Sequence, residues 1–274
     1  MKTVHRWGAL AVFLIVLTGG GSAASAQTAF AIDTSSNLYR VNLQSGAATL
    51  VGHNSSALME GLAYDTVSGR LWGTDDGGTI HEIDPNSGAN ISGVNTPIFD
   101  PEGLDFNAPN SLWLADSNST MTMHQFNTLT NTLGPALSTN AADGAARALA
   151  FNQAGTRAYF IGDLPASPNQ SLWRFDLAGS ATLVGPTGTQ FSNGSILAAI
   201  DMDLSGTMWG LDGSGRVGTV NLNTGAFTLS GVNTGGQFWL DMSLIPEPAG
   251  VLTLTACATC AALSRLLRRC RPGR

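Results

Sequence analysis

The chain has almost no cysteine or lysine outside its two ends. The three cysteines, Cys257, Cys260 and Cys270, all lie close to the C-terminus, and the only lysine is Lys2. Without cysteine, the central body cannot be held by a disulfide framework, so its stability must come from a hydrophobic core of its own. Cys257 and Cys260 form a CxxC, but no βαβ pattern surrounds them, which excludes a thioredoxin-like redox centre.

Positive charge is equally scarce in the body. Of 13 Lys and Arg residues, two lie near the N-terminus and five in the C-terminal tail, which leaves six arginines. The 19 acidic residues all fall between Asp33 and Glu247, so the body carries a net charge near −13. Such a surface repels nucleic-acid phosphates and anionic lipids. A nucleic-acid role is therefore excluded, whereas cations and neutral glycans remain plausible partners.

The sequence also lacks the common catalytic motifs. It contains no GxSxG, HExxH, P-loop or EF-hand loop, and Asp116-Ser117-Asn118 begins like the last of these without the required Gly. The histidines of the body, His53, His81 and His124, show no zinc-ligand spacing. We therefore expect no enzyme activity and no resident cofactor, with Ca²⁺ as the one metal that the acidic composition would suit.

The N-terminus has the pattern of a cleavable signal peptide. Lys2 and Arg6 precede an apolar stretch that ends at Leu17, and Ala24-Ser25-Ala26 fits the small-x-small motif cut by signal peptidase. The apolar stretch is too short for a comfortable membrane span, which favours cleavage over anchoring. We expect a signal peptide over residues 1–26 and a mature start at Gln27.

Residues 27–245 contain an internal repeat of short β-strands. Gly, Asn, Ser and Thr are abundant and the apolar runs are short, which is typical of an all-β chain. Similar segments recur every 40 to 50 residues or so, a spacing that suits four-stranded propeller blades. Their aligned anchor positions are Leu62, Leu104, Leu149 and Ile200.

Turn residues recur at fixed places in these units. Asp84-Pro85-Asn86-Ser87-Gly88 follows one predicted third strand, and Asn42 to Gly46 and Asn221 to Gly225 repeat its pattern. An Asx side chain can accept a hydrogen bond from the backbone two residues on, and Gly accepts the positive φ that closes a hairpin. These turns therefore support the repeat on physical grounds.

The two ends of the body complete each other. The segment from Thr28 contains three strands without a first one, and the segment from Gln237 to Pro246 is a lone first strand. Pairing them closes a fifth blade and removes the exposed sheet edges. The sequence thus predicts a β-propeller of five four-stranded blades. A β-sandwich is the alternative fold, but it would not explain why the missing strand appears at the other end.

Acidic residues are predicted to gather at the mouth of the central channel. Asp33, Asp75, Asp116, Asp163 and Asp212 end the second strand of each blade, and we expect them to be turn residues, since the same position repeats in every blade. Glu60 and Glu102 open first strands, with Asp100 just before one of them. Asp105, Asp201 and Asp241 are predicted to share one register within the first strands. The candidate acidic channel mouth consists of Glu60, Glu102, Asp105, Asp201 and Asp241. Arg147 occupies the position of Glu60 and Glu102 and is expected to pair with one of them.

The C-terminal residues 246–274 contain a recognisable motif. Pro246-Glu247-Pro248 is followed by an apolar run from Ala249 to Ser264 and then by an arginine cluster. The clustered arginines are Arg265, Arg268, Arg269 and Arg271, with Arg274 at the end. The run would make a short transmembrane helix of roughly 24 Å at about 1.5 Å per residue, with its arginines on the cytoplasmic side.

This tail resembles the PEP-CTERM sorting signal of exported proteins of Gram-negative bacteria. The resemblance covers only the last thirty residues or so, and it implies recognition by an exosortase, cleavage near Pro-Glu-Pro, and release or surface attachment after transient anchoring in the inner membrane. The expected function is that of an exported propeller with a binding or structural role, associated with the cell surface or exopolysaccharide. The alternatives are a carboxylate- or Ca²⁺-dependent extracellular hydrolase and a lectin-like glycan binder.

Overall fold

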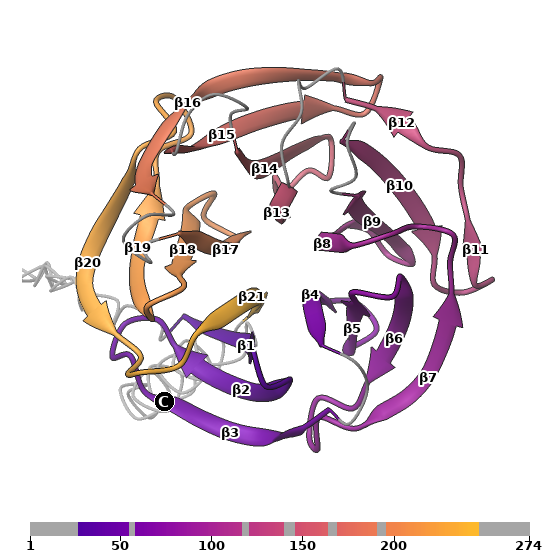
Figure 1. Cartoon of the computed structure of the whole chain (residues 1–274), viewed down its shortest axis with the longest axis horizontal. Helices are drawn as coiled ribbons and strands as arrows, with labels where there is room; N and C mark the ends of the chain where they lie inside the picture. Colours follow the sequence, from indigo (N-terminus) through magenta and orange to yellow (C-terminus); the bar gives the residue numbers. More distant parts are fainter. Residues whose placement is uncertain are drawn as a thin grey trace, which may run out of the picture.

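The protein is a five-bladed β-propeller in a computed structural model (Figure 1). The structure describes residues 27–54, 58–116, 121–139, 146–163, 169–190 and 196–246. Within these ranges, no helix is long and apolar enough to cross a membrane. The predicted signal peptide, with Ala24 and Ala26, lies outside the described residues, as do Glu247, Pro248 and the predicted helix with Arg265, Arg268, Arg269 and Arg271.

Each blade is an antiparallel sheet whose first strand lies nearest the central channel (Figure 1). The first complete blade contains β4 (Met59–Asp65), β5 (Arg70–Asp75), β6 (Thr79–Ile83) and β7 (Asn90–Asn95). The second contains β8 (Pro101–Ala108), β9 (Ser111–Asp116) and β10 (Thr122–Asn127), with its outermost strand divided into β11 (Thr132–Leu133) and β12 (Leu137–Ser138).

The next two blades follow the same order. The third contains β13 (Ala146–Phe151), β14 (Arg157–Asp163), β15 (Asn169–Asp176) and β16 (Ser180–Gln190). The fourth contains β17 (Leu197–Met202), β18 (Met208–Asp212), β19 (Arg216–Val220) and β20 (Phe227–Asn233). The hairpin turns have the predicted chemistry: Asn42 Oδ1, for example, accepts the backbone N–H groups of Gln44 and Ser45, and Gly46 has a φ of +76°.

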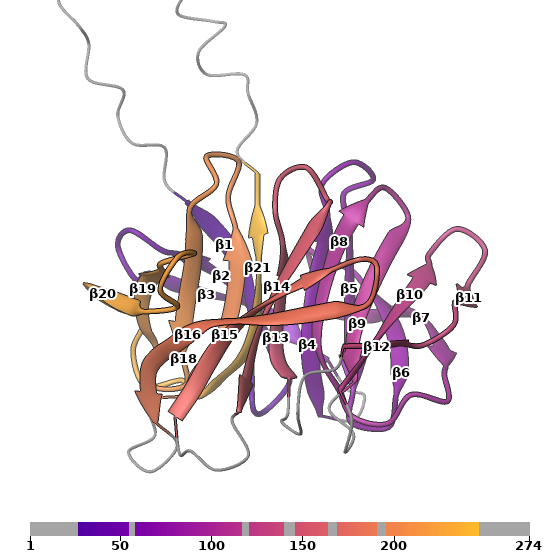
Figure 2. The same cartoon turned by 90° about the horizontal axis from the view of Figure 1, so that it is seen from above.

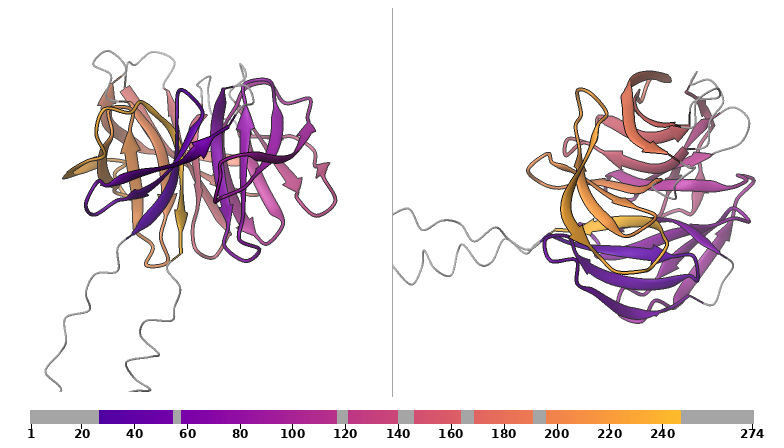
Figure 3. Two further views of the ribbon diagram at one scale, coloured as in Figure 1. Left: turned by 90° about the horizontal axis from the view of Figure 1, so that it is seen from below. Right: turned by 60° about the vertical axis from the view of Figure 1, so that its left-hand side comes forward.

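The fifth blade is built from both ends of the body, as predicted. Its strand order is β21 (Trp239–Ile245), β1 (Thr28–Asp33), β2 (Asn37–Asn42) and β3 (Ala48–His53). The antiparallel register between β1 and β21 runs from Thr28 opposite Ile245 to Asp33 opposite Trp239. Figures 2 and 3 show these two strands side by side, with β1 beginning and β21 ending at the same face of the propeller. Closing the ring in this way gives the fifth blade its innermost strand and pairs the edge of β1 that would otherwise be open.

The hydrophobic core consists of five clusters, one between each pair of neighbouring blades. One cluster, for example, packs Phe30 and Leu38 of the fifth blade against Leu62 and Leu71 of the first. Trp72, Trp113 and Trp239 are almost completely buried in such clusters. The blades therefore adhere through apolar burial, which positions the inner strands around the channel.

Candidate functional site: two mouths of one channel

The inner strands place the predicted acidic residues at two opposite ends of the channel. Glu60 and Tyr64 are four residues apart on β4, which corresponds to roughly 13 Å along an extended strand. One end, where the inner strands begin, is the narrow mouth, with Glu60, Glu102 and Arg147. The other end, where the inner strands finish, is the wide mouth and contains Asp105 and Asp201. The predicted single acidic mouth is thus divided between two places.

At the narrow mouth, three carboxylates approach one another. One carboxylate oxygen each from Glu60, Asp100 and Glu102 lies within 4.8 Å of the other two. Arg147 Nη1 is 3.6 Å from Glu102 Oε1, which agrees with the pairing expected from their aligned positions. The cavity that the described residues form here is small, about 80 Å³.

The narrow mouth also changes the protonation of Glu60. Burial raises the pKa of Glu60 to about 8, and a hydrogen bond with Asp100 and the negative charges of Asp100, Glu102 and Asp76 add to the effect. Glu60 is therefore protonated at neutral pH and can act as a hydrogen-bond donor to Asp100.

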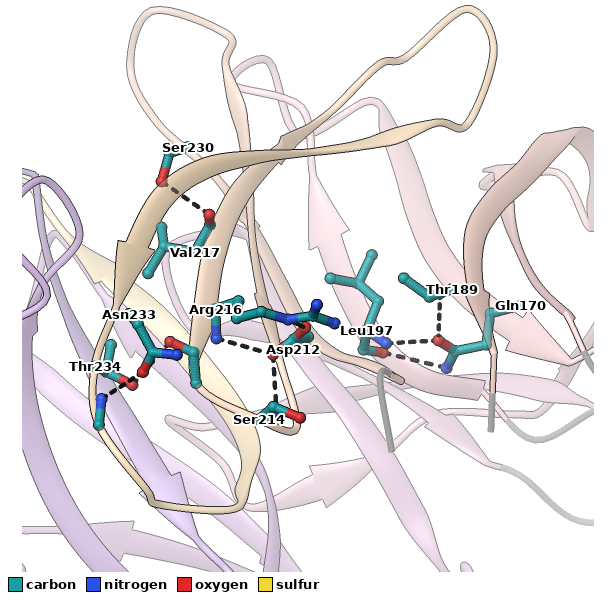
Figure 4. A network of polar contacts seen from close by, with 12 residues as sticks. Gln170, Thr189, Leu197, Asp212, Ser214, Arg216, Val217, Ser230, Asn233 and Thr234 are labelled. Carbon is teal, nitrogen blue, oxygen red and sulfur yellow. Dashed lines mark hydrogen bonds and ion pairs between the residues drawn. The ribbon is translucent and has the colours of Figure 1, made fainter. Parts of the chain in front are cut away.

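Three of the aspartates that end the second strands are turn residues, namely Asp33, Asp75 and Asp212. Asp212 Oδ1 accepts the backbone N–H groups of Ser214 and Arg216, and its Oδ2 accepts Arg216 Nε at 2.6 Å (Figure 4). Asp33 Oδ1 makes the same two backbone contacts in the fifth blade, and Asp75 Oδ1 accepts the N–H of Thr79. The prediction of Asx turns is confirmed for these three residues.

Inside the channel, polar side chains satisfy the unpaired edges of the inner strands. Asp105 Oδ1 accepts the backbone N–H of the next residue, Phe106, at 2.7 Å. Its Oδ2 accepts the backbone N–H of Phe151 in the next blade. Asp201 does the same with Met202 and Leu244, both at 2.6 Å. Two carboxylates thus bond four edge amides, which would otherwise be buried without acceptors.

The fifth amide at this level is bonded by a hydroxyl group. Ser243 Oγ accepts the N–H of Tyr64 at 2.9 Å, and Ser243 lies opposite Phe30, just as Asp105 and Asp201 lie opposite Trp113 and Trp209. Ser243, and not Asp241, is therefore the register equivalent of Asp105 and Asp201. The expectation that Asp241 shares their register is wrong by two residues. The register of the closing strand β21 is set by its pairing with β1, which comes from the other end of the body, and not by a hairpin with the next strand in the chain.

Asp241 lies one step deeper in the channel. It occupies the position that is Gly or Ala in the other inner strands, and its Oδ2 accepts the N–H of Leu62 in the next blade at 2.7 Å. Burial raises the pKa of Asp241 well above its ordinary value, and the charges of Asp201 and Asp105 raise it further. Burial likewise raises the pKa of Asp105, and raises that of Asp201 to about 6 although backbone hydrogen bonds oppose this.

The wide mouth opens into the larger cavity, about 440 Å³ in volume. Five large side chains, one from each blade, line it immediately above the buried carboxylates. This collar consists of Tyr64, Phe106, Phe151, Met202 and Leu244. Each collar residue also packs into a different inter-blade core cluster. The collar is therefore held rigidly by the same contacts that hold the blades together.

Sequence reasoning did not single out the collar, although a signal was present. Four of its members stand two residues after the aligned anchors Leu62, Leu104, Leu149 and Ile200. Above the collar, the cavity is rimmed by the residues that end the inner strands, namely Asp65, Asn107, Asn152 and Asp203. Gln27 and Pro246 line the same mouth, so both ends of the described body lie beside it.

The described histidines do not form a cluster. His81 Nε2 is 2.9 Å from Asp75 Oδ2, whereas His124 contacts Thr122 and His53 contacts Asn37. Among the described residues, Glu60, Asp100 and Glu102 are the one group of three that could hold a metal ion.

Comparison with protein-family models and with curated proteins finds no match to this chain. Among solved structures, hydrazine synthase from Kuenenia stuttgartiensis is similar over 70% of this chain and 65% of its own chain, less than two thirds of its length. The sequence identity is 14% and the TM-score is 0.45. A likeness of this degree assigns neither a family nor an activity.

Proposed function

We propose that this protein is an exported β-propeller with a binding role, sorted by an exosortase through its C-terminal signal and retained at the cell surface or in exopolysaccharide. The ligand site of the proposal is the wide mouth. The observation that carries the sorting part is the agreement between the folded body and the predicted processing points. β1 begins at Thr28 and β21 ends at Ile245, next to the predicted cuts before Gln27 and near Pro-Glu-Pro. Both cuts would leave all five blades complete.

The size and lining of the wide mouth support the binding part. Its volume of about 440 Å³ falls within the range of pockets for small ligands, roughly 300–1,000 Å³, whereas the narrow-mouth cavity of about 80 Å³ does not. The wide mouth also combines apolar collar residues with a few polar rim groups, the usual composition of a ligand pocket.

Intact-mass analysis of the exported protein tests the sorting proposal. In a Gram-negative host with an exosortase, we expect a mature chain that starts at Gln27 and ends near Pro246. A variant in which Pro246, Glu247 and Pro248 are all replaced by Ala should keep its tail and remain with the membrane fraction. Recovery of the native chain outside the cell with its C-terminus intact would overturn the proposal.

The hydrolase is a second candidate, favoured by one observation at the narrow mouth. Glu60, whose pKa is raised to about 8, lies beside the carboxyl groups of Asp100 and Glu102, and glycoside hydrolysis uses two such groups, one of them as a general acid. Release of reducing ends from the exopolysaccharide of the host would support this function. Loss of that release in the Glu102→Gln variant, but not in Glu82→Gln, would place it at the narrow mouth.

A further inference from the structure

We infer that the wide mouth binds a small organic ammonium ion, in which an N–H donor is joined to an aromatic or aliphatic group. This inference rests on the proposed binding role of the same mouth and adds the chemical class of the ligand. It follows from the charge of the cavity walls, the shape of the collar and one hydrogen-bond acceptor left over in the wall.

The rim of the wide mouth carries negative charge. The rim contains the carboxylates of Asp65 and Asp203. The carboxyl groups of Asp105 and Asp201 lie beneath the collar, where burial raises their pKa. None of the described lining residues is Lys, Arg or His. Arg70 lies opposite Asp65 in the pairing of β4 with β5, and Glu82 engages it through two hydrogen bonds. A cation entering this cavity would meet a field of one sign, reinforced by the acidic surface of the body.

The negative charge of Asp203 in the rim is maintained at neutral pH. Although burial opposes it, hydrogen bonds from Ser205, Trp209 and Thr207 lower the pKa of Asp203. Its two oxygens are already engaged in the turn, so Asp203 acts on a ligand through its field and not as a direct ligand atom. The carboxylate of Asp65 is engaged in the same way by Val67 and Ser68.

The collar supplies the apolar half of the site. Tyr64, Phe106 and Phe151 come from three consecutive blades, and Met202 and Leu244 complete the ring. Aromatic faces attract cations as well as apolar groups, so an aromatic collar beneath a negative rim suits a ligand that carries both. A simple metal ion would gain nothing from the collar.

One buried acceptor of a lining residue has no donor among the described residues. Asn107 donates its Nδ2 to the carbonyl of Gly155, which fixes the orientation of the amide, and its buried Oδ1 has no hydrogen-bond partner among the described residues. A buried acceptor without a donor is costly, and an N–H group of a bound ammonium ion would remove that cost. Neutral sugars could also donate to Asn107, so the test must separate charge from hydrogen bonding.

The rim itself shows which substitutions can change its charge without disturbing the fold, and two such variants form the charge series of the test. The strand-ending position is Asp in two blades (Asp65, Asp203) and Asn in two others (Asn107, Asn152), so both residues are compatible with the turn. Asn152 Oδ1 accepts the N–H groups of Thr156 and Arg157, contacts that an Asp would keep. Asp203→Asn should therefore remove one negative charge from the rim, and Asn152→Asp should add one, without disturbing the turn.

The experiment is calorimetric titration of the purified exported protein and of these two variants with matched probes. The probes are phenethylammonium, its neutral isostere 2-phenylethanol, the anion 3-phenylpropionate, and glucose. We expect phenethylammonium to bind the native protein more tightly than 2-phenylethanol. Its affinity should fall about three- to tenfold in Asp203→Asn and rise by a similar factor in Asn152→Asp, as expected for one charge at short range in a partly solvated site.

Two outcomes would overturn the inference in distinguishable ways. Equal binding of phenethylammonium and 2-phenylethanol, or binding of glucose alone, with no response to the charge series would reject the ligand class and leave the binding role standing. Absence of binding for every probe, with Phe106→Ala also unresponsive to all of them, would reject the wide mouth as the ligand site and with it the binding role proposed above.

Discussion

Asp201 on β17 accepts the backbone N–H of Leu244 on β21 at 2.6 Å, and so joins the fourth blade to the closing strand. Its other oxygen accepts the N–H of Met202. The pattern repeats between Asp105 and Phe151, and Ser243 plays the corresponding part toward Tyr64. The buried acidic residues of the channel thus form hydrogen bonds that a ring of inner strand edges requires.

These contacts predict a graded loss of stability. Asp105→Ala leaves two buried amides without acceptors, and Ser243→Ala leaves one. Since an unsatisfied buried group costs about 1–3 kcal/mol, we expect losses of about 2–5 kcal/mol and about 1–3 kcal/mol in the free energy of unfolding. Urea denaturation would measure both. A loss in Asp105→Ala no greater than that in Ser243→Ala would contradict the assignment of two amides to one carboxylate.

A second prediction concerns closure of the ring by β21. Trp239 is fully buried, lies edge-on to Tyr39 with ring centroids 5.1 Å apart, and donates Nε1 to Thr234 Oγ1 at 2.7 Å. Trp239→Ala should lower the free energy of unfolding by about 3–5 kcal/mol, the usual cost of removing a buried aromatic side chain. The neighbouring Phe238 is 44% exposed, so Phe238→Ala should cost less than about 1 kcal/mol. Equal effects in denaturant unfolding would argue against closure at Trp239.

A third prediction is a fall in stability as the pH rises. The pKa of Glu60 is raised from 4.5 to about 8 in the folded protein, so the folded state binds the proton more tightly than the unfolded state. The resulting stabilisation is complete below about pH 4.5 and is lost as the pH rises through 8. The pKa of Asp201 is raised from 3.8 to about 6, so Asp201 also stabilises the folded state at low pH. This stabilisation is lost as the pH rises through 6, before that of Glu60.

The variants Glu60→Gln and Glu82→Gln separate this effect from others. Glu60→Gln should flatten the decline in melting temperature between pH 6 and pH 9, because a neutral amide stays at that position throughout. Glu82 has a pKa lowered mainly by its hydrogen bond with Arg70, so it titrates below this range. Glu82→Gln should therefore keep the native slope, and a slope unchanged in Glu60→Gln would show that Glu60 does not hold its proton.

A fourth prediction tests the turn aspartates. Asp212 is fully buried and bonds two backbone N–H groups and Arg216 Nε. Asp212→Ala should lower the free energy of unfolding by about 2–4 kcal/mol, since the turn loses its acceptor and Arg216 loses its partner. Asp212→Asn keeps one acceptor oxygen and should lose distinctly less. If the two substitutions proved equally harmful in chemical denaturation, the ion pair and not the turn would carry the effect.

Much of the fold could be predicted from local physics. The Asx residues and glycines at 42–46, 84–88 and 221–225 specify hairpins by themselves, because side-chain hydrogen bonds and positive φ values are decided within a few residues. The missing strand before Thr28 and the surplus strand after Gln237 likewise had one economical solution, since a sheet edge must be paired or protected.

The sites were less predictable for physical reasons. Glu60 and Asp105 were assigned to one mouth, but strands run through the channel, so residues a few positions apart emerge at its opposite ends. Asp241 was misaligned because the register of β21 is set by pairing with β1 and not by its own sequence. The collar was missed because apolar residues at a repeated position predict a core as readily as a pocket wall.

The repeat, the strand and turn pattern, the acidic character of the body and the composite blade can be deduced from the sequence, because they depend on short-range chemistry and composition. The carboxylates that meet, the amides they satisfy and the place of the cavity cannot be deduced in this way, because they depend on how five inner strands converge around one axis. Tyr64 and Leu244 are far apart in the chain, and the closed ring places them in one collar.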